Sequence, residues 1–362
     1  MSVVLIPFVA GDYKMIESLT VENFRCFESV EIHDLKRINV LVGRNASGKT
    51  ALLEAIFMAS AGHAEVALRM RSWRLLGQAE IKLEREAVEA LWRDMFFGFD
   101  LSKFITISIK GTPQSTQTVR VFNTQAEAVF VPIGEKTVEV DAVFPIVFER
   151  IDGEGKKVTL PVKLTGEGMS VKVGGSQVKA AFYPSGFKPD PKEAAGRFSE
   201  LSKKKLETRV ITTLQRVYPF IESLSVENVG GEYHIFASVA GLPEKMPVSL
   251  ISEGVYKLMS VLLGIAATHH GAVLIDEIEN GFYFETLPDI WKLLLEFAEE
   301  YKTQLFISTH SLEAIKALLP TLEGNEGKFT LMRTDASEGK GAVRQFTGMN
   351  FRRAIEQKIE IR

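Results

Sequence analysis

The sequence predicts an α/β fold with a mostly parallel core sheet, into which an antiparallel β-rich lobe and a helical segment are inserted. Three observations lead to this prediction. The apolar run Ile38–Val42 passes through a glycine-containing loop into a helix rich in Ala, Leu and Glu. Short β-rich runs separated by glycine turns fill residues 104–183, as in an antiparallel sheet. After Gly254 helices and strands alternate, which favours a parallel sheet.

Length and composition indicate a globular protein with more than one subdomain or a large insertion. The chain has 362 residues, of which 46% are hydrophobic and 25% charged. A net charge of −3 argues against a basic nucleic-acid-coating protein but leaves room for a local basic groove. Cys26 is the only cysteine, which excludes a disulfide framework and fits a reducing compartment. The apolar N-terminus lacks the features of a signal peptide, and the ten-residue run Leu258–Ala267 cannot span a bilayer. We therefore expect a soluble, cytoplasmic protein without a membrane partner.

Changes in pattern divide the chain into four sections. Apolar residues follow helical spacing from Phe198 to Val217, and Tyr218-Pro219 predicts the end of that helix. The last section predicts core strands at Ala272–Ile275 and Gln304–Ser308, with a helix at Leu287–Glu300 between them. We expect the N-terminal half of the core at 1–100, the β-rich lobe at 101–185, the helical segment at 186–225 and the C-terminal half of the core at 226–362.

A phosphate-binding loop is the strongest motif of the chain. It matches G-x-x-x-x-G-K-[ST] at every fixed position, between a predicted strand and a predicted helix. Its glycines let backbone N–H groups converge on phosphates, and the helix N-terminus adds a positive dipole end. We expect Lys49 to reach the β- and γ-phosphates of ATP and Thr50 to ligate Mg²⁺. The predicted nucleotide-binding residues of the loop are Gly43, Arg44, Asn45, Ala46, Ser47, Gly48, Lys49 and Thr50.

Two acidic residues end the apolar strand Ala272–Ile275, as in a Walker B motif. Asp276 is a candidate Mg²⁺ ligand through water, and Glu277 could orient and deprotonate the attacking water. A strand that ends in two acids is common at protein surfaces. The P-loop in the same chain is what favours function here.

Two further residues gain meaning from their order along the chain. Taken locally, Ser252 is an N-cap of the helix that contains Gly254, and His310 after the strand Gln304–Ser308 is more often a structural histidine. However, a P-loop, a Ser-x-Gly helix start, an Asp-Glu strand end and a histidine after the next strand occur in this sequence order.

In this order the motifs resemble the ATP-binding-cassette ATPases of the RecF/SMC/OLD group. The opening Leu19–Phe27 resembles the N-terminal signature of that group, and Ile275–Gly281 resembles its Walker B motif and D-loop. The resemblance implies catalytic roles for Glu277 and His310. It also implies a head-to-tail dimer that encloses ATP, in which Ser252 and Gly254 face the γ-phosphate bound by the other subunit.

The chain also departs from parts of that group. No sustained heptads lie between Thr50 and Ser252, so the long arms of SMC proteins are not expected. A Q-loop glutamine is not clear, and Gln78 is one candidate. The segment after His310 is too short for the TOPRIM nuclease domain of OLD enzymes. The ending Phe351–Arg362 resembles the close of stand-alone ATPases of this group, which are often paired with a separately encoded effector such as a nuclease, including in bacterial antiviral defence.

The leading interpretation is a dimerising Mg-ATPase that controls a partner effector, in phage defence. The alternative is a RecF-like DNA-repair ATPase that binds DNA. A transporter subunit is disfavoured by the altered signature Ser252–Lys257, and no guanine-reading Asn/Thr-Lys-x-Asp sequence supports a GTPase. An ATP-binding scaffold without turnover also stays open, although Glu277 counts against it.

Overall fold

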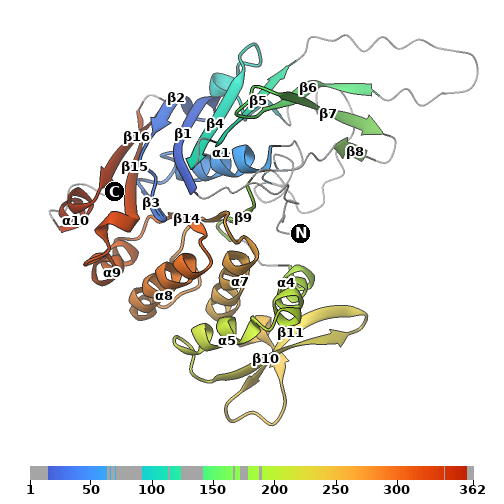
Figure 1. Cartoon of the computed structure of the whole chain (residues 1–362), viewed down its shortest axis with the longest axis vertical. Helices are drawn as coiled ribbons and strands as arrows, with labels where there is room; N and C mark the ends of the chain where they lie inside the picture. The colour runs from blue at the N-terminus through green and yellow to red at the C-terminus, as the bar shows by residue number, and fades with distance from the viewer. Residues whose placement is uncertain are drawn as a thin grey trace, which may run out of the picture.

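The described part of the 362-residue chain, seen in a computed structural model, contains two large sheets, a small three-stranded sheet, and helices between and below the large sheets (Figure 1). It describes residues 15–62, 66, 70, 92–112, 115–123, 142–165, 168–171, 178–186, 190–337 and 339–356.

The core is a six-stranded sheet in the order β16-β15-β3-β14-β13-β9. Its strands from β15 to β9 pair in parallel, and β16 adds an antiparallel edge. Strands β3, β14, β13 and β9 are buried at every residue, as expected for parallel strands covered on both faces. This confirms the mostly parallel core. The strands are β3 (Ile38–Val42), β9 (Ala180–Tyr183), β13 (Ala272–Ile275), β14 (Gln304–Ser308), β15 (Phe329–Ser337) and β16 (Lys340–Thr347).

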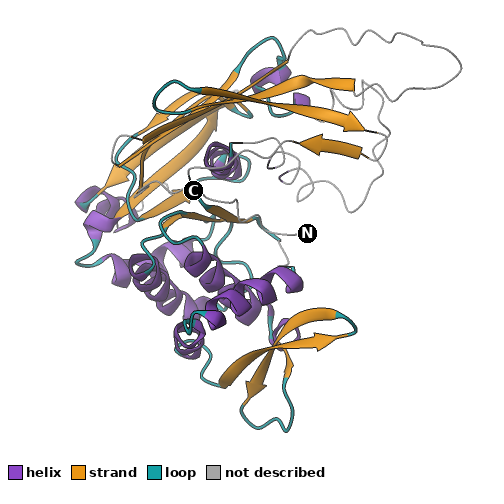
Figure 2. Cartoon of the chain, turned by 45° about the vertical axis from the view of Figure 1, so that its right-hand side comes forward, coloured by secondary structure: helices purple, strands orange, loops and turns teal. Residues whose placement is uncertain are grey.

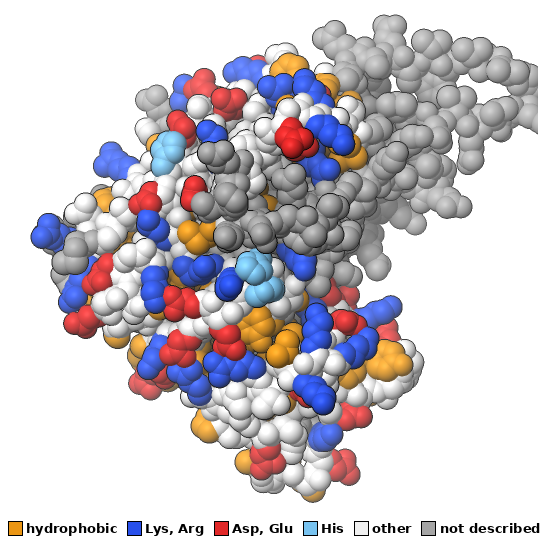
Figure 3. Space-filling view, viewed as in Figure 1, with side chains coloured by type: hydrophobic (Ala, Val, Ile, Leu, Met, Phe, Trp, Pro, Cys, Tyr) orange, Lys and Arg blue, Asp and Glu red, His pale blue; other side chains and the backbone are white. Residues whose placement is uncertain are grey.

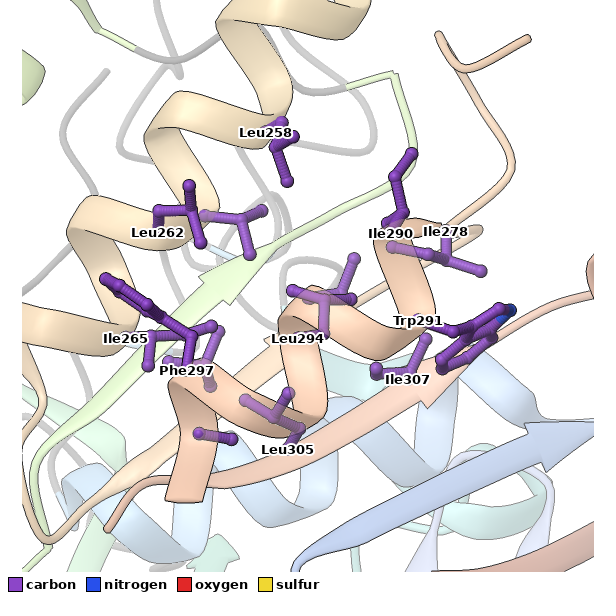
Figure 4. Packing of buried hydrophobic residues seen from close by; sticks show 14 of the residues in the cluster. Leu258, Leu262, Ile265, Ile278, Ile290, Trp291, Leu294, Phe297, Leu305 and Ile307 are labelled. Carbon is purple, nitrogen blue, oxygen red and sulfur yellow. The ribbon is translucent and has the colours of Figure 1, made fainter. Parts of the chain in front are cut away.

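Alternating side chains of this sheet enter two separate hydrophobic cores. Val40 and Ile307 point toward the helices α7 (Glu253–Ala267), α8 (Leu287–Glu300) and α9 (Leu312–Leu322). Figure 4 shows α7 and α8 packing there, with Ile307 below Trp291 and Leu294. Leu41 and Phe306 instead join the core around α1 (Lys49–Ala61). The sheet therefore fixes α1, the helix that follows the P-loop, on one face and α7, the signature helix that begins after Ser252, on the other.

A seven-stranded antiparallel sheet forms the β-rich lobe, in the order β2-β1-β4-β5-β6-β7-β8. Helix α1 lies between it and the core sheet (Figure 2). The predicted antiparallel lobe is confirmed, and it continues directly from the two N-terminal strands. One part of the prediction is wrong: β9 pairs in parallel with β13 and belongs to the core sheet. The lobe strands are β1 (Met15–Phe24), β2 (Phe27–Ile32), β4 (Ile105–Thr112), β5 (Ser115–Asn123), β6 (Ala142–Ile151), β7 (Lys157–Thr165) and β8 (Gly168–Val171).

The helical segment contains two helices where the sequence predicts one. Helix α4 (Pro191–Lys203) begins at the N-cap Asp190, and α5 (Glu207–Gln215) follows it. Lys205 between them has φ 59°, a left-handed conformation that interrupts a helix. The apolar spacing carries across this break because both helices pack on the same core.

A small three-stranded sheet then leads to the signature helix (Figure 2). No described helix is long and apolar enough to cross a membrane. The remaining elements are β10 (Ile221–Val229), β11 (Glu232–Val239), β12 (Met246–Pro247), α6 (Val248–Ile251), α10 (Met349–Glu356) and the 3-10 turns η1 (Phe97–Phe99), η2 (Phe284–Thr286) and η3 (Glu326–Lys328).

Candidate ATPase site

The P-loop lies between β3 and α1, where the sequence places it. Gly43 and Gly48 have φ of 144° and 102°, which side chains rarely allow. A Cβ on Gly43 would lie 2.3 Å from the carbonyl oxygen of Thr334, and one on Gly48 would lie 2.8 Å from Sγ of Cys26. The two glycines are therefore required by backbone conformation and by close packing.

Lys49 folds back onto the loop that precedes it. Its Nζ donates to the carbonyl oxygens of Gly43 (2.8 Å) and Arg44 (3.0 Å). Burial lowers the pKa of Lys49, while the carboxylates of Asp276 and Glu277 act in the opposite direction. A bound phosphate would compensate this buried ammonium directly, which suits an anion site.

Hydroxyl and carboxylate oxygens meet at the end of β13. Thr50 Oγ1 donates to Asp276 Oδ2 (2.8 Å), and the Ser308 hydroxyl donates to the other carboxylate oxygen. Asp276 is only 4% exposed, and its backbone N–H donates to the carbonyl oxygen of Tyr183 (2.8 Å). Hard oxygen donors of this kind fit Mg²⁺, with phosphate and water oxygens completing the shell.

Glu277 lies next to this pair in a strained left-handed conformation (φ 51°). Its Oε2 accepts hydrogen bonds from the Ser185 hydroxyl and from Asn280 Nδ2 (2.8 Å), and its Oε1 lies 3.3 Å from His310 Nδ1. Burial raises the pKa of Glu277, but the hydrogen bonds from Ser185 and Asn280, with His310 and Lys49 nearby, outweigh it and lower the pKa. The carboxylate is therefore ionised at neutral pH, as a general base must be.

His310 is held between two carboxylates. Its Nδ1 lies 3.1 Å from Glu279 Oε1, in addition to the contact with Glu277, and its backbone N–H donates to the same Glu279 oxygen (3.0 Å). The structure thus places His310 beside the candidate base, as expected from its position after β14.

Ser252 and Gly254 lie at the start of α7, away from the P-loop cavity. Ser252 is the N-cap, since its Oγ accepts from the Val255 N–H (3.1 Å). A Cβ on Gly254 would lie 2.5 Å from the carbonyl oxygen of Gly281, so the helix start touches the segment that follows Glu277. Neither Ser252 nor Gly254 is among the described residues that line the cavity of about 840 Å³ around the P-loop. A single chain does not bring the two predicted phosphate sites together.

No individual role was predicted from the sequence for three residues of this region. Ser185 and Asn280 bind the Glu277 carboxylate, and Lys257 on α7 donates to the backbone carbonyls of Glu277 (2.9 Å) and Asn280 (2.8 Å). A serine after a short apolar run is common, so the sequence held no specific signal for Ser185. The Q-loop candidate Gln78 lies outside the described residues.

Two family models match the chain. Residues 15–93 match a model described as "AAA ATPase domain", and residues 177–316 match one described as "AAA domain, putative AbiEii toxin, Type IV TA system". The matched ranges include the P-loop, the strand end at Asp276 and Glu277, and His310.

Individual relatives agree with this result. An ATP/GTP phosphatase of Helicobacter pylori is 21% identical over 343 residues, which cover 84% of this chain and 87% of the relative. The DNA replication and repair protein RecF of Clostridium acetobutylicum is 47% identical over 47 residues, only 13% of either chain.

Similar solved structures include an SMC head bound to the C-winged helix domain of ScpA, with 17% identity and a TM-score of 0.49. It covers 92% of this chain and 98% of that chain. The SMC head domain from Thermotoga maritima has 14% identity and a TM-score of 0.39, covering 91% and 98%.

The two ATPase-domain matches and the similarity to an ATP/GTP phosphatase support an ATP-hydrolysing enzyme, with a short stretch similar to RecF. The enzyme class predicted from the sequence is confirmed.

Proposed function

We propose that this RecF/SMC-like ATPase closes around two Mg-ATP molecules as a head-to-tail dimer, and that hydrolysis controls a separately encoded effector. The observation that carries the proposal is the separation, within one chain, of the P-loop from the predicted phosphate contact at the start of α7. Ser252 and Gly254 do not line the P-loop cavity, yet α7 contacts the segment after Glu277. A second subunit would bring its own α7 start to this cavity.

The residues of one chain supply most of the chemistry. Lys49 would place its ammonium on the β- and γ-phosphates. Thr50 and Asp276 would hold Mg²⁺, which supplies neutralisation of phosphate charge when bound. Glu277, ionised and held by its neighbours, would accept a proton from the attacking water, and His310 would fix the orientation of Glu277.

The partner subunit would complete the site with its helix start. The N-terminus of α7 carries a positive dipole end, which suits a γ-phosphate. ATP would then bind the closed dimer more tightly than the open form, and this difference in affinity would shift the conformation. Loss of the γ-phosphate would let the dimer open, and the effector would respond to that change.

The test mixes two inactive variants, Lys49→Ala and Ser252→Arg. A mixed dimer has one intact composite site, formed by the P-loop of the Ser252→Arg subunit and the α7 start of the Lys49→Ala subunit. We expect each variant to be inactive alone and the mixture to recover part of the ATPase activity. If the mixture stays inactive although subunit exchange is demonstrated, a site completed by a second subunit is refuted.

The proposal also includes a partner and a biological role, namely control of a separately encoded effector in phage defence. The description of the second family model names a toxin and a type IV toxin–antitoxin system, which supports a role of this kind. We expect the cytoplasm as the compartment. Control of an effector can be tested by purifying the hydrolysis-deficient Glu277→Gln variant from the native host with and without ATP. An effector under ATP control should co-purify in an amount that depends on the nucleotide.

A RecF-like role in DNA repair is the second candidate, favoured by the 47-residue stretch shared with RecF. On the face drawn in Figure 3, acidic and basic side chains are interspersed rather than gathered into one basic field. Duplex DNA binding that requires ATP and weakens steeply with salt would support this candidate. Equal retention of DNA with and without ATP would count against it.

A further inference from the structure

The P-loop cavity has a second wall, built by the segment that precedes β4. Asp94, Phe96 and Phe99 line the same cavity of about 840 Å³ as the P-loop residues. This segment is fastened beside the P-loop by Arg25, whose backbone N–H donates to Met95 O (2.8 Å) and whose Nη1 donates to Asp94 Oδ2 (2.8 Å).

The turn between β1 and β2 connects this wall to the phosphate site. Cys26 follows Arg25 and packs so closely on the P-loop that a Cβ on Gly48 would lie 2.8 Å from its Sγ. Cys26 and Gly339 also line the cavity. A ligand with phosphates on the P-loop therefore has this turn and the wall of Asp94–Phe99 as its neighbours.

Phe99 is the exposed aromatic residue of the wall. Its side chain is 58% exposed, whereas Phe96, three residues earlier, is 1% exposed and belongs to the core. Phe99 also has φ 60°, directly after Gly98 with φ 63°. A bulky residue in the left-handed region is strained, and such strain persists where the surroundings impose it.

The surroundings of Phe99 account for this conformation. Its N–H donates to Phe96 O (3.0 Å), and its carbonyl oxygen accepts from Arg93 Nε (3.3 Å). The backbone of η1 is thus fixed at both sides of the exposed ring. An aromatic ring kept on a cavity wall at a cost in backbone strain offers a preformed flat apolar surface.

We infer that Phe99 is the stacking surface of a nucleobase subsite in this cavity, so that the preferred ligand is a nucleoside triphosphate rather than a bare polyphosphate. The inference rests on the proposed binding of ATP at the P-loop and adds the residue that holds the base. Every base has a π-face, and base–aromatic stacking tolerates different bases. The subsite therefore favours nucleotides in general, with ATP and GTP bound to a similar extent.

Calorimetric titration of the full chain with Mg-ATP, Mg-GTP and Mg-tripolyphosphate tests the inference. Phe99→Ala should weaken ATP and GTP binding by about tenfold, which is the order of a lost stacking contact, and leave tripolyphosphate binding unchanged. Because alanine is strained at φ 60°, Phe99→Gly serves as a second variant that removes the ring without backbone strain. Phe99→Trp keeps an aromatic ring at this position and should bind nucleotides as the wild type does.

Phe97→Ala is the matched control, since Phe97 lies in the same turn but is not among the described residues that line the cavity. It should bind all three ligands like the wild type. Equal loss of ATP and tripolyphosphate affinity in both Phe99 variants would overturn the inference, as would unchanged ATP affinity in Phe99→Gly. Failure of the wild type to bind ATP at all would instead refute the P-loop assignment, so the two failures are distinguishable.

Discussion

Replacement of Glu277 by glutamine tests the proposed chemistry most directly. Glutamine keeps the length and shape of the side chain, and its amide oxygen can still accept the hydrogen bonds from Ser185 and Asn280. The amide cannot accept a proton from water at neutral pH. The contacts of Lys49 with the loop and of Thr50 with Asp276 are untouched.

The expected loss of hydrolysis rate follows from the proposed role of Glu277 as general base. Loss of a positioned general base lowers the rate about 10²- to 10⁴-fold. At about 1.36 kcal/mol for each factor of ten, the activation barrier rises by roughly 2.7–5.4 kcal/mol. Its neighbours lower the pKa of Glu277, so the carboxylate of the wild type is ionised over the whole neutral range. The fall in hydrolysis rate caused by the substitution should therefore be constant between pH 6 and 8.

The assay is single-turnover hydrolysis at saturating Mg-ATP, with equilibrium binding of ATP measured in parallel. Binding should persist while hydrolysis falls. Glu285→Gln is the control, since it makes the same chemical change at an exposed glutamate eight residues further along the chain. A Glu277→Gln rate close to that of the wild type would refute the reasoning and point to His310 as the base.

Three further predictions test the site and the fold. Lys49→Ala should abolish binding of a fluorescent ATP analogue while the thermal unfolding transition remains, and unchanged affinity would remove the P-loop assignment. Burial lowers the pKa of Lys257 to about 8, against the opposing carboxylates of Glu279, Glu253, Glu277 and Asp276. Above pH 8 the neutral amine has fewer donors for the carbonyls after β13, so ATPase activity should decline there, and Lys257→Arg should retain activity to higher pH; identical pH profiles would contradict this role. Limited proteolysis should not release residues 104–183 as a stable fragment, because β4 pairs with β1 in one sheet.

The core elements were predictable because their signals are local. Four elements have the predicted bounds: Ile38–Val42, Ala272–Ile275, Leu287–Glu300 and Gln304–Ser308. Each is a continuous apolar or amphipathic run whose length, periodicity and flanking residues indicate its type. The prediction was wrong where the pairing partner of a strand determines which sheet the strand joins. The run Ala180–Tyr183 resembles the lobe strands before it, but its neighbour is β13, far away in the sequence.

The residues of the candidate site likewise fall into those that a local motif predicts and those that only tertiary contacts reveal. Motif spacing indicated Lys49, Thr50, Asp276 and Glu277, because phosphate and metal chemistry requires these residue types in this order along the chain. Ser185 has no such signal, since a serine after a strand is common and only the parallel pairing of β9 with β13 brings it to the carboxylate of Glu277.

The sequence by itself determined the P-loop, the acidic strand end and the class of enzyme, because a phosphate-binding loop is encoded within a few consecutive residues. Only the tertiary structure decided which side chains surround Glu277, that the start of α7 lies outside the P-loop cavity, and that Phe99 lines this cavity. These relations depend on contacts between residues distant in the sequence. The burial of two cores on opposite faces of one sheet fixes them, and no local pattern of residues records that arrangement.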